Sequence, residues 1–347
     1  MCFIKYYICE SARKVDLKMS FIAKAEKEMA KTQTRKYKGF KDFYVKNRSQ
    51  IPLTAMSLPA VILVFMFSYM PMFGIILAFK DFNVREGIFG SPWCGLNNFS
   101  YLFKSNDAFI MLRNTLGYNL LFLVVGTILN LTLAVALSLL RNKWGKKIYQ
   151  TIYIMPHFLS MVIVSYLVLS LLNMENGFLN RTILPMLGMD PVNWYTTEWP
   201  WPFILPIVNF WKWTGYSSIM YIAAIAGIDT QLYEAAAIDG ATLPKQIWHI
   251  TLPSLRTLIC ISLITQVGSI LSGDFGLYYQ VPMNSGVIKD VTTTIPVYTF
   301  KNLTSGSAST LGLASSTSFL QSVVGCILVI TTNKVIDKIS HGENSLF

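Results

Sequence analysis

The fold class that this sequence predicts is an all-α integral membrane protein with six transmembrane helices and both termini in the cytoplasm. Of its 347 residues, 53% are hydrophobic and only 14% are charged, whereas soluble domains carry about 25% charged residues. The apolar residues gather in six stretches, each long enough for the roughly 20 residues that a bilayer-spanning helix needs. Composition therefore excludes an ordinary soluble globular protein.

The six predicted spans fall within residues 51–333, which we treat as one membrane domain. In order, they run through Leu53–Phe79, Asn114–Leu140, Tyr149–Leu172, Phe203–Ile228, Leu255–Leu271 and Leu313–Thr332. Several contain Pro or Gly, which membrane helices tolerate where neighbours satisfy the freed backbone groups. We expect a basic cytoplasmic segment (residues 1–50) before this domain and a cytoplasmic tail (residues 334–347) after it.

The orientation follows from the basic residues, because cytoplasmic loops of membrane proteins are enriched in Lys and Arg. With the N-terminus inside, the inner segments hold 21 of the 29 basic side chains and the outer segments hold 7. Thirteen of the inner ones fall in residues 1–50, so the net charge of +11 indicates a membrane surface rather than nucleic acid. That segment is either a basic helix on the inner leaflet or a solvated chain, and Met1, Met19 and Met29 are alternative start sites.

A polar interruption, residues 229–253, separates the fourth and fifth spans on the cytoplasmic side. In the first half of this loop we expect Asp229 or Thr230 to cap a short helix, Glu234–Ile238 to form it and Gly240 to make the turn at its end. In the second half we expect a second short helix, with Pro244 in its first turn and Pro253 at its exit. The alanines of the first helix leave a nearly flat face, and Glu234 offers a charge to a partner's Arg or Lys. The alternative is a plain surface helix, because alanine is the best helix former.

The spacing within this loop resembles, position for position, the EAA loop of ABC-importer permeases. The matching residues are Glu234, Ala235, Ala236, Gly240, Ile250, Leu252 and Pro253, with Asp239 directly before the glycine. The pattern spans twenty residues with no gap to adjust. The resemblance implies that this loop contacts a partner ATPase and couples ATP hydrolysis to transport, with Glu234 paired to a basic residue there.

The resemblance extends over nearly all of residues 53–347 and is strongest to polysaccharide and oligosaccharide permeases of the LplB type. The residues that carry it are Gly95-Leu96-Asn97-Asn98-Phe99, Asn114-Thr115, Pro156, Ser160, Gly177, Asn180, Gly188, Trp194, Gly273–Tyr279 and Ser345-Leu346-Phe347. One departure is Thr294-Ile295, where that branch tends to have Asp-Thr. Residues 1–50 carry none of the resemblance.

This resemblance implies a MetI-like permease fold in a bacterial cell membrane and a role in carbohydrate import by alternating access. It also implies a second permease subunit (a heterodimer), two ATPase subunits that bind ATP and Mg, and an extracellular solute-binding lipoprotein that delivers the sugar. Permeases of other solutes remain an alternative. A less favoured alternative is a membrane enzyme acting on lipid-linked sugars, which the scattered outer acidic residues do not support. A third alternative is an ATP-independent channel, which would not need the Glu234 loop.

Catalytic and metal-binding signatures are missing from the sequence. There is no G-x-x-x-x-G-K-[ST] to cradle ATP phosphates, so we expect no enzyme activity, cofactor or metal on this chain. The histidines and cysteines form no zinc-site or disulfide pattern, being scattered as His157, His249 and His341, and as Cys2, Cys9, Cys94, Cys260 and Cys326.

Lys212 is the one charged residue well inside a predicted span. An ionisable residue within a membrane is by default a functional candidate, facing a cavity or a partner carboxylate. The alternative, that the helix begins later and Lys212 snorkels outward, leaves Trp213–Ile228, which is too short to span. We therefore expect Lys212 to be buried or to face a pathway, with Trp213 beside it. The neighbouring tryptophans, interpreted as an aromatic belt rather than a sugar-stacking surface, are Trp194, Trp199, Trp201, Trp211 and Trp213.

Overall fold

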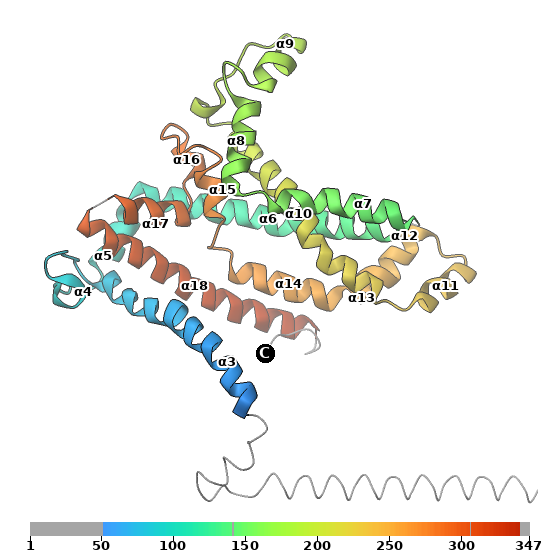
Figure 1. Ribbon diagram of the computed structural model, residues 1–347, viewed down its shortest axis with the longest axis horizontal. Coiled ribbons are helices and arrows are strands. Elements are labelled where there is room, and N and C mark those ends of the chain that lie inside the picture. The colour runs from blue at the N-terminus through green and yellow to red at the C-terminus, as the bar shows by residue number, and fades with distance from the viewer. Residues whose placement is uncertain (1–50, 141, 306, 341–347) are drawn as a thin grey trace, which may run out of the picture. The chain divides into compact units, whose positions relative to one another are not determined.

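The computed structural model describes residues 51–140, 142–305 and 307–340. Within these residues the chain is helical, apart from turns, loops and one isolated bridge between Lys80 and Trp93. It divides into two units, residues 1–73 and 74–347, each of which is described by itself (Figure 1). The predicted basic segment, residues 1–50, and residues 341–347 of the predicted tail lie outside the described residues.

The described part of the first unit is an apolar helical run that continues into the second. The run consists of α3 (Ile51–Val64), the π-helical turn η1 (Phe65–Tyr69) and the 3-10 helix η2 (Met70–Phe79), of which residues 74–79 belong to the second unit. Residues 54–79 are long and apolar enough to cross a membrane, which agrees with the first predicted span. Pro71 donates no backbone hydrogen bond, and the α-helix gives way to π and 3-10 turns around it.

The second unit contains the remaining helices. From residue 74 to 228 they are α4 (Gly87–Gly90), α5 (Asn97–Lys104), α6 (Asn106–Ser138), α7 (Lys143–Ile154), η3 (Met155–Phe158), α8 (Met161–Leu172), η4 (Leu179–Ile183), α9 (Leu184–Met186), η5 (Trp194–Thr196) and α10 (Trp201–Ala226). From residue 229 onward they are α11 (Thr230–Ile238), α12 (Leu243–Gln246), η6 (Ile247–Thr251), α13 (Leu252–Ser254), α14 (Arg256–Gly268), α15 (Phe275–Tyr279), α16 (Lys289–Thr292), α17 (Ile295–Thr304) and α18 (Ala308–Ser340).

Four of these helices form the body of the second unit. α6 packs against α10, and α14 packs against α18; all four are labelled in Figure 1. The short helices α11, α12 and α13 lie at one end of this body, and α5 and α17 lie at the other. α8 and α9 extend away from it to the side.

Two predicted spans are broken rather than straight. The third is cut at Leu159–Ser160, where the helical run Lys143–Phe158, made of α7 and η3, meets α8 at 98°. Pro156 stands in the first turn of η3, and Ser160 caps α8 by accepting from the amide of Ile163. The fifth is shorter than expected, because α14 has only 13 residues, or about 20 Å at 1.5 Å per residue. α12–α13 precedes it at an angle of 60°. Sequence hydropathy detects the apolar run but not the break inside it.

By length and composition, the described residues contain three continuous helices that could cross a membrane, or up to five if each bent pair counts as one span. The predicted count of six additionally requires α10. That helix has 26 residues but does not meet the hydropathy criterion, because Asn, Lys, Thr and Ser interrupt its apolar residues. Several of these polar residues are turned into the unit: Lys212 and Ser218 are buried.

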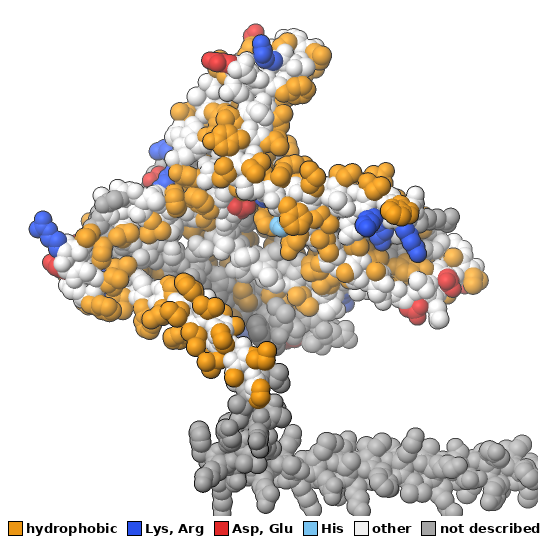
Figure 2. All heavy atoms as spheres, viewed as in Figure 1, with side chains coloured by type: hydrophobic (Ala, Val, Ile, Leu, Met, Phe, Trp, Pro, Cys, Tyr) orange, Lys and Arg blue, Asp and Glu red, His pale blue; other side chains and the backbone are white. Residues whose placement is uncertain are grey.

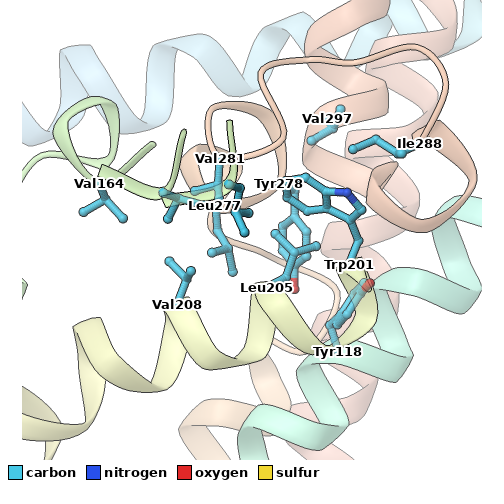
Figure 3. Packing of buried hydrophobic residues seen from close by; sticks show 12 residues of the cluster. Tyr118, Val164, Trp201, Leu205, Val208, Leu277, Tyr278, Val281, Ile288 and Val297 are labelled. Atoms are coloured by element: carbon cyan, nitrogen blue, oxygen red, sulfur yellow. The ribbon is translucent and has the colours of Figure 1, made fainter. Parts of the chain in front are cut away.

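The largest hydrophobic cluster holds the second unit together where α6, α8, α10 and α15 meet (Figure 3). Trp201 and Leu205 of α10 are fully buried there, against Leu277 and Tyr278 of α15 and Tyr118 of α6. A second cluster lies further along α6 and α10, around Leu137 and Tyr221. Burying one large apolar side chain contributes about 1.5–3 kcal/mol, so this packing fixes α10 along its length.

Polar side chains of α6 fasten the segment between α14 and α17. The Asn119 amide donates to the carbonyls of Ile270 (2.6 Å) and Ser272 (2.7 Å). The side-chain amide of Asn114 donates to the backbone carbonyls of Asp290 and Thr293. These bonds give a structural role to the Asn114-Thr115 pair noted in the sequence. Asn98, from the same resemblance, donates to the carbonyls of Ala78 and Lys80, each at 3.0 Å. Asparagines of the shared motifs therefore hold neighbouring segments in place through hydrogen bonds to their backbone carbonyls.

The tryptophans of residues 194–213 do not form one aromatic belt. Trp201 is fully buried and donates to the Trp194 carbonyl at 2.8 Å. Trp194 itself donates to the side-chain oxygen of Asn180, which also accepts from the Val192 amide. Trp199 and Trp211 are exposed and remain compatible with a belt. The neighbouring Tyr195 hydroxyl donates to Val281, and burial raises the pKa of this tyrosine to about 12, so it stays a protonated donor at neutral pH.

Candidate functional site

The 229–253 loop begins with the predicted cap. Asp229 has extended backbone angles, and its side chain accepts a hydrogen bond from the Gln231 amide at 2.9 Å, which starts α11. Of the two predicted caps, Asp229 is therefore the correct one and Thr230 is the first helical residue. An N-cap of this kind contributes about 1 kcal/mol, so α11 is ordered by its own sequence.

Gly240 closes α11 in the way that the sequence predicts. Its φ is +77°, in the left-handed region that favours glycine. The Ala241 amide donates to Ala236 (2.8 Å), and the Gly240 amide donates to Ala237 (3.1 Å), the pair of bonds that defines a Schellman motif. A Cβ at this position would meet no atom within 4 Å, so the requirement for glycine is the backbone angle alone.

A hydrogen bond ties α11 to the second half of the loop. The Tyr233 hydroxyl lies 2.9 Å from the hydroxyl of Thr251, which is buried. Pro244 stands in the first turn of α12, as predicted, and Pro253 lies one residue before the end of the helical run Leu243–Ser254, close to the exit that the sequence predicts. Because Pro253 lacks an N–H, the preceding turn widens into the π-helix η6, and the chain bends only at Leu255, before α14.

The predicted coupling residues share one loop but not one surface. Glu234, Ala235, Asp239, Gly240 and Pro253 are exposed, whereas Ala236, Ile250 and Leu252 are half-buried. Ile238, which the sequence analysis did not single out as a contact, is 87% exposed at the end of α11. Figure 2 shows acidic side chains at this end of the second unit, near the basic side chains where α7 begins. The exposed face of α11 thus combines one carboxylate, small side chains and an apolar tip.

A second candidate site is a cavity of about 490 Å³, which we call the polar cavity. It lies among α6, α10, the end of α14 and the segment that follows. Amide and hydroxyl side chains alternate with aromatic rings around it, and its lining consists of Asn119, Phe122, Leu123, Gly126, Asn130, Asn209, Phe210, Trp213, Thr214, Ser217, Gln266, Ser269, Ile270, Ser272, Gly273 and Asp274. Its side chains can therefore exchange hydrogen bonds with hydroxyl groups and stack on an apolar ring face.

One polar atom of the cavity lining is left unsatisfied. The side-chain oxygen of Asn130 is buried and has no hydrogen-bond partner among the described residues. An unsatisfied buried acceptor costs about 1–3 kcal/mol, and this atom is itself enclosed by protein rather than exposed to the cavity.

The structure separates Lys212 from the cavity and places Trp213 in it. Lys212 is only 5% exposed, and its ammonium group donates to the backbone carbonyls of His157 and Leu159. These carbonyls lie at the break between η3 and α8. The sequence predicts that Lys212 is either buried or faces a pathway, and the structure shows that it is buried. The described residues place it outside the cavity lining, because its charge is used to satisfy carbonyls that the break leaves free.

Close packing holds α10 against the same break. The imidazole of His157 stacks on the ring of Tyr216, with centroids 3.9 Å apart, and meets the edge of Trp213 at 4.8 Å. At Gly215, a Cβ would fall on the backbone carbonyl of Tyr153 in α7. The position of Trp213 in the cavity wall thus depends on a glycine and a lysine that do not line the cavity.

The sequence analysis missed most of the cavity residues, although the sequence carries a signal for them. On α6, Asn119, Gly126 and Asn130 recur at helical spacing, and on α10 Asn209, Trp213 and Ser217 recur every four residues. Polar residues at i, i+4 and i+8 in an apolar helix mark one face, and polar groups within membranes face the bundle interior. Asp274 was quoted only as part of a family motif and not as a site residue.

Comparison with known proteins assigns the family. Residues 126–331 match the family described as binding-protein-dependent transport system inner membrane component. The polygalacturonan/rhamnogalacturonan transport system permease protein YteP of Bacillus subtilis is 34% identical over 310 residues, covering 88% of this chain and 94% of that protein. Protein LplB of the same organism is 32% identical over 282 residues, covering 81% of this chain and 87% of that protein.

The fold also matches a solved transporter. A bacterial ABC transporter involved in the import of the acidic polysaccharide alginate contains a chain that is 30% identical to this one, with a TM-score of 0.77. The match covers 86% of this chain and 99% of that chain. A second crystal structure describes the alginate transporter in complex with an alginate pentasaccharide-bound periplasmic protein, and it matches equally well with a TM-score of 0.77. The sequence and fold together identify this chain as a member of the family of inner membrane components of binding-protein-dependent transport systems, with the MetI-like permease fold.

Proposed function

We propose that this chain is a transmembrane permease subunit of an ATP-driven importer of carbohydrate, taking up oligosaccharides or polysaccharide fragments. The observation that carries this proposal is the polar cavity. Its amide and hydroxyl groups suit sugar hydroxyls, and Phe122, Phe210 and Trp213 offer ring faces for stacking. At about 490 Å³, it falls within the roughly 300–1,000 Å³ of typical ligand sites.

The relatives support a carbohydrate substrate. Those named for a substrate refer to polygalacturonan and rhamnogalacturonan, arabino-oligosaccharides, trehalose and maltose, lactose, and alginate. Glycans are common to all of these names, although the individual sugars differ in charge and linkage. These names support a glycan as the substrate of this chain. They do not identify the individual sugar, which depends on the residues that line its own pathway.

The 229–253 loop is the site at which the partner ATPase docks. Its first helix is ordered by a cap and a Schellman turn, and its exposed face carries Glu234 and Ile238. A rigid helix of this kind can pass on movement, because the chain connects it directly to α10 and the Tyr233–Thr251 bond ties it to the second half of the loop. The sequence contains no P-loop motif, so in this proposal ATP and Mg bind to two partner ATPase subunits and not to this chain.

In the assembled importer, this chain supplies one of two permease subunits. The second permease closes the pathway opposite the polar cavity, and an extracellular solute-binding lipoprotein delivers the glycan. The membrane domain, residues 51–333, crosses the bilayer six times, counting α10 and each bent pair as one span. Both termini and the 229–253 loop lie in the cytoplasm, with residues 1–50 and 334–347 flanking the membrane domain.

Cysteine accessibility tests this orientation. In a variant without the five native cysteines, Asp190→Cys and Lys245→Cys each place one thiol at an exposed position. A membrane-impermeant maleimide is expected to label residue 190 in intact cells and residue 245 only after permeabilisation. Labelling of residue 245 in intact cells would reverse the orientation and remove the ATPase-docking proposal.

Reconstitution tests the function itself. Proteoliposomes that hold both permeases and the ATPases, supplied with the binding protein, are expected to accumulate glycan only with ATP. The control omits this chain, and a second control uses a non-hydrolysable ATP analogue. Uptake by this chain alone would establish a channel instead, and ATP-dependent uptake of amino acids or phosphate esters without uptake of glycans would contradict the carbohydrate proposal.

A further inference from the structure

One face of α7 is apolar and exposed. Trp144, Ile148 and Ile152 recur every four residues along this helix, and each has more than half of its surface exposed, Trp144 as much as 77%. Residues four apart lie on the same face of a helix, so these three side chains form one row, which we call the α7 stripe. At 1.5 Å per residue, the stripe is about 12 Å long.

Two exposed lysines stand beside the first residue of the stripe. Lys143 and Lys147 lie one turn apart at the start of α7, on either side of Trp144 in the sequence, and Figure 2 shows basic side chains where this helix begins. Neither ammonium group takes part in a hydrogen bond or an ion pair with the described residues. Residues 108–174 contain no Asp or Glu. The two lysines therefore have no acidic partner within their own part of the chain.

The third lysine of this turn has different surroundings. Lys146 is half-buried and lines a cavity of about 300 Å³ together with Thr230 and Tyr233 of α11. Residues two apart in a helix do not share a face, so Lys146 lies on the side of the 229–253 loop and Ile148 on another side. The positive charge next to the stripe comes from Lys143 and Lys147.

We propose that the α7 stripe, with Lys143 and Lys147, is a binding site for an anionic phospholipid, whose phosphate lies at the lysines and whose acyl chain lies along the stripe. A phospholipid joins a negative group to an apolar chain, which is the order in which α7 presents its lysines and its apolar side chains. The stems of lysines lie along apolar surface while their charged ends reach the headgroups, and tryptophan is enriched at the membrane–water boundary. This inference goes beyond glycan import; in the orientation proposed above, the lipid belongs to the inner leaflet.

The surroundings of the stripe favour a lipid over a protein partner. α7 belongs to the bent pair Lys143–Phe158 and Met161–Leu172, which together are apolar enough to cross a membrane. An acidic surface of the ATPase could pair with the lysines, but it would end at the membrane surface and leave the stripe uncovered. A lipid satisfies the charges and the apolar row together.

Quenching of tryptophan fluorescence by brominated lipids tests the inference. The assembled importer is placed in phosphatidylcholine nanodiscs that contain an equal fraction of either brominated phosphatidylglycerol or brominated phosphatidylcholine. Subtracting the signal of the Trp144→Phe variant isolates the quenching at Trp144. Phosphatidylglycerol is expected to bind there about tenfold more strongly than phosphatidylcholine, because each lysine near a membrane surface favours an anionic lipid. In the variant with Lys143→Gln and Lys147→Gln, the two lipids are expected to bind about equally.

Two further variants make the result specific. Lys143→Arg with Lys147→Arg keeps both charges and is expected to keep the preference for phosphatidylglycerol. Lys334→Gln with Lys338→Gln removes two exposed lysines from α18. It changes the net charge by the same amount as the double Gln variant of α7 and is expected to leave the preference at Trp144 unchanged.

Equal binding of the two lipids in the unmodified importer, or a preference that survives in the double Gln variant of α7, overturns the inference. Absence of quenching at Trp144 also overturns it, because a partner subunit would then cover the stripe. An equal loss of preference in the α18 variant would attribute the effect to the overall charge of the surface and overturn the local site. These measurements involve no transported solute, so their failure leaves the carbohydrate proposal standing.

Discussion

The 229–253 loop and the polar cavity differ in how their residues are distributed along the sequence. The loop is contiguous: its cap, helix, glycine turn and anchoring hydroxyl fall within 25 residues and depend on one another locally. The cavity draws its lining from α6, α10, α14 and the segment after it, over 150 residues of chain. Local hydrogen bonds define the first site, whereas packing between distant helices defines the second.

The two sites are therefore sensitive to mutation at different kinds of residue. A change in the loop acts through backbone angles and caps within the loop. A change in the cavity acts either directly, on a lining side chain, or at a distance, on the residues that position α10. Substitutions at Gly215, Gly240, Trp213 and Glu234 separate these cases.

Gly215→Ala is expected to have the largest effect, because it disturbs the frame of the cavity. The added Cβ would fall on the carbonyl of Tyr153, and backbone cannot move aside as a side chain can. We expect most of the assembled permease to be lost, measured as monodisperse complex after solubilisation. The matched control is Gly117→Ala on α6, where a Cβ meets nothing within 4 Å. Equal yields of the two variants would contradict the packing of α7 against α10.

Gly240→Val is expected to reduce ATP-dependent uptake about tenfold or more while leaving membrane insertion intact. A β-branched residue in the left-handed region adds about 1–3 kcal/mol of strain, which the loop relieves by changing the direction of α11. The measurement is glycan uptake at matched permease content.

The control for this prediction is Gly240→Asn, because Asn visits the left-handed region more readily. It is expected to retain most of the uptake, since the space around Gly240 is open. If Val and Asn are equally damaging, the requirement at this position is not the backbone angle.

Trp213→Ala tests the cavity directly. Loss of the indole face is expected to raise the half-saturating glycan concentration about tenfold, in line with the roughly 1–3 kcal/mol that one aromatic stacking contact contributes. Trp211→Ala, two residues earlier on α10 and exposed, provides the control and is expected to change little. Equal effects at the two positions would show that the helix, and not the cavity wall, is being damaged.

Glu234→Ala is expected to have the smallest effect of the four. Glu234 is exposed on α11, and a charge-assisted hydrogen bond to the ATPase contributes about 1.5–3 kcal/mol. Docking should therefore weaken without being abolished, and excess ATPase should restore uptake. The affinity of the ATPase for the permease pair is the quantity to measure, with Glu175→Ala, at an exposed position far from the 229–253 loop in the sequence, as the control.

The same contrast explains how much the sequence could predict. The local structure of the loop was predicted almost completely, including Asp229 or Thr230 as cap, Gly240 as turn and Pro253 near the exit of the second helix, because capping is a local property. The apolar runs of the membrane domain were also found. The 98° break at Leu159–Ser160 was not predicted, because a straight helix and a bent helix of the same composition have the same hydropathy. The buried roles of Lys212 and Trp201 needed the tertiary packing of α10.

The central claim is that the loop couples ATP hydrolysis to transport and that the cavity forms the glycan path. Parallel assays of ATP hydrolysis stimulated by loaded binding protein and of glycan uptake, on Gly240→Val and Trp213→Ala, test it most directly. We predict that Gly240→Val loses stimulated hydrolysis and uptake together, whereas Trp213→Ala keeps stimulated hydrolysis and loses uptake at low glycan concentration. Normal stimulated hydrolysis in Gly240→Val, or its loss in Trp213→Ala, would contradict this division between the two sites.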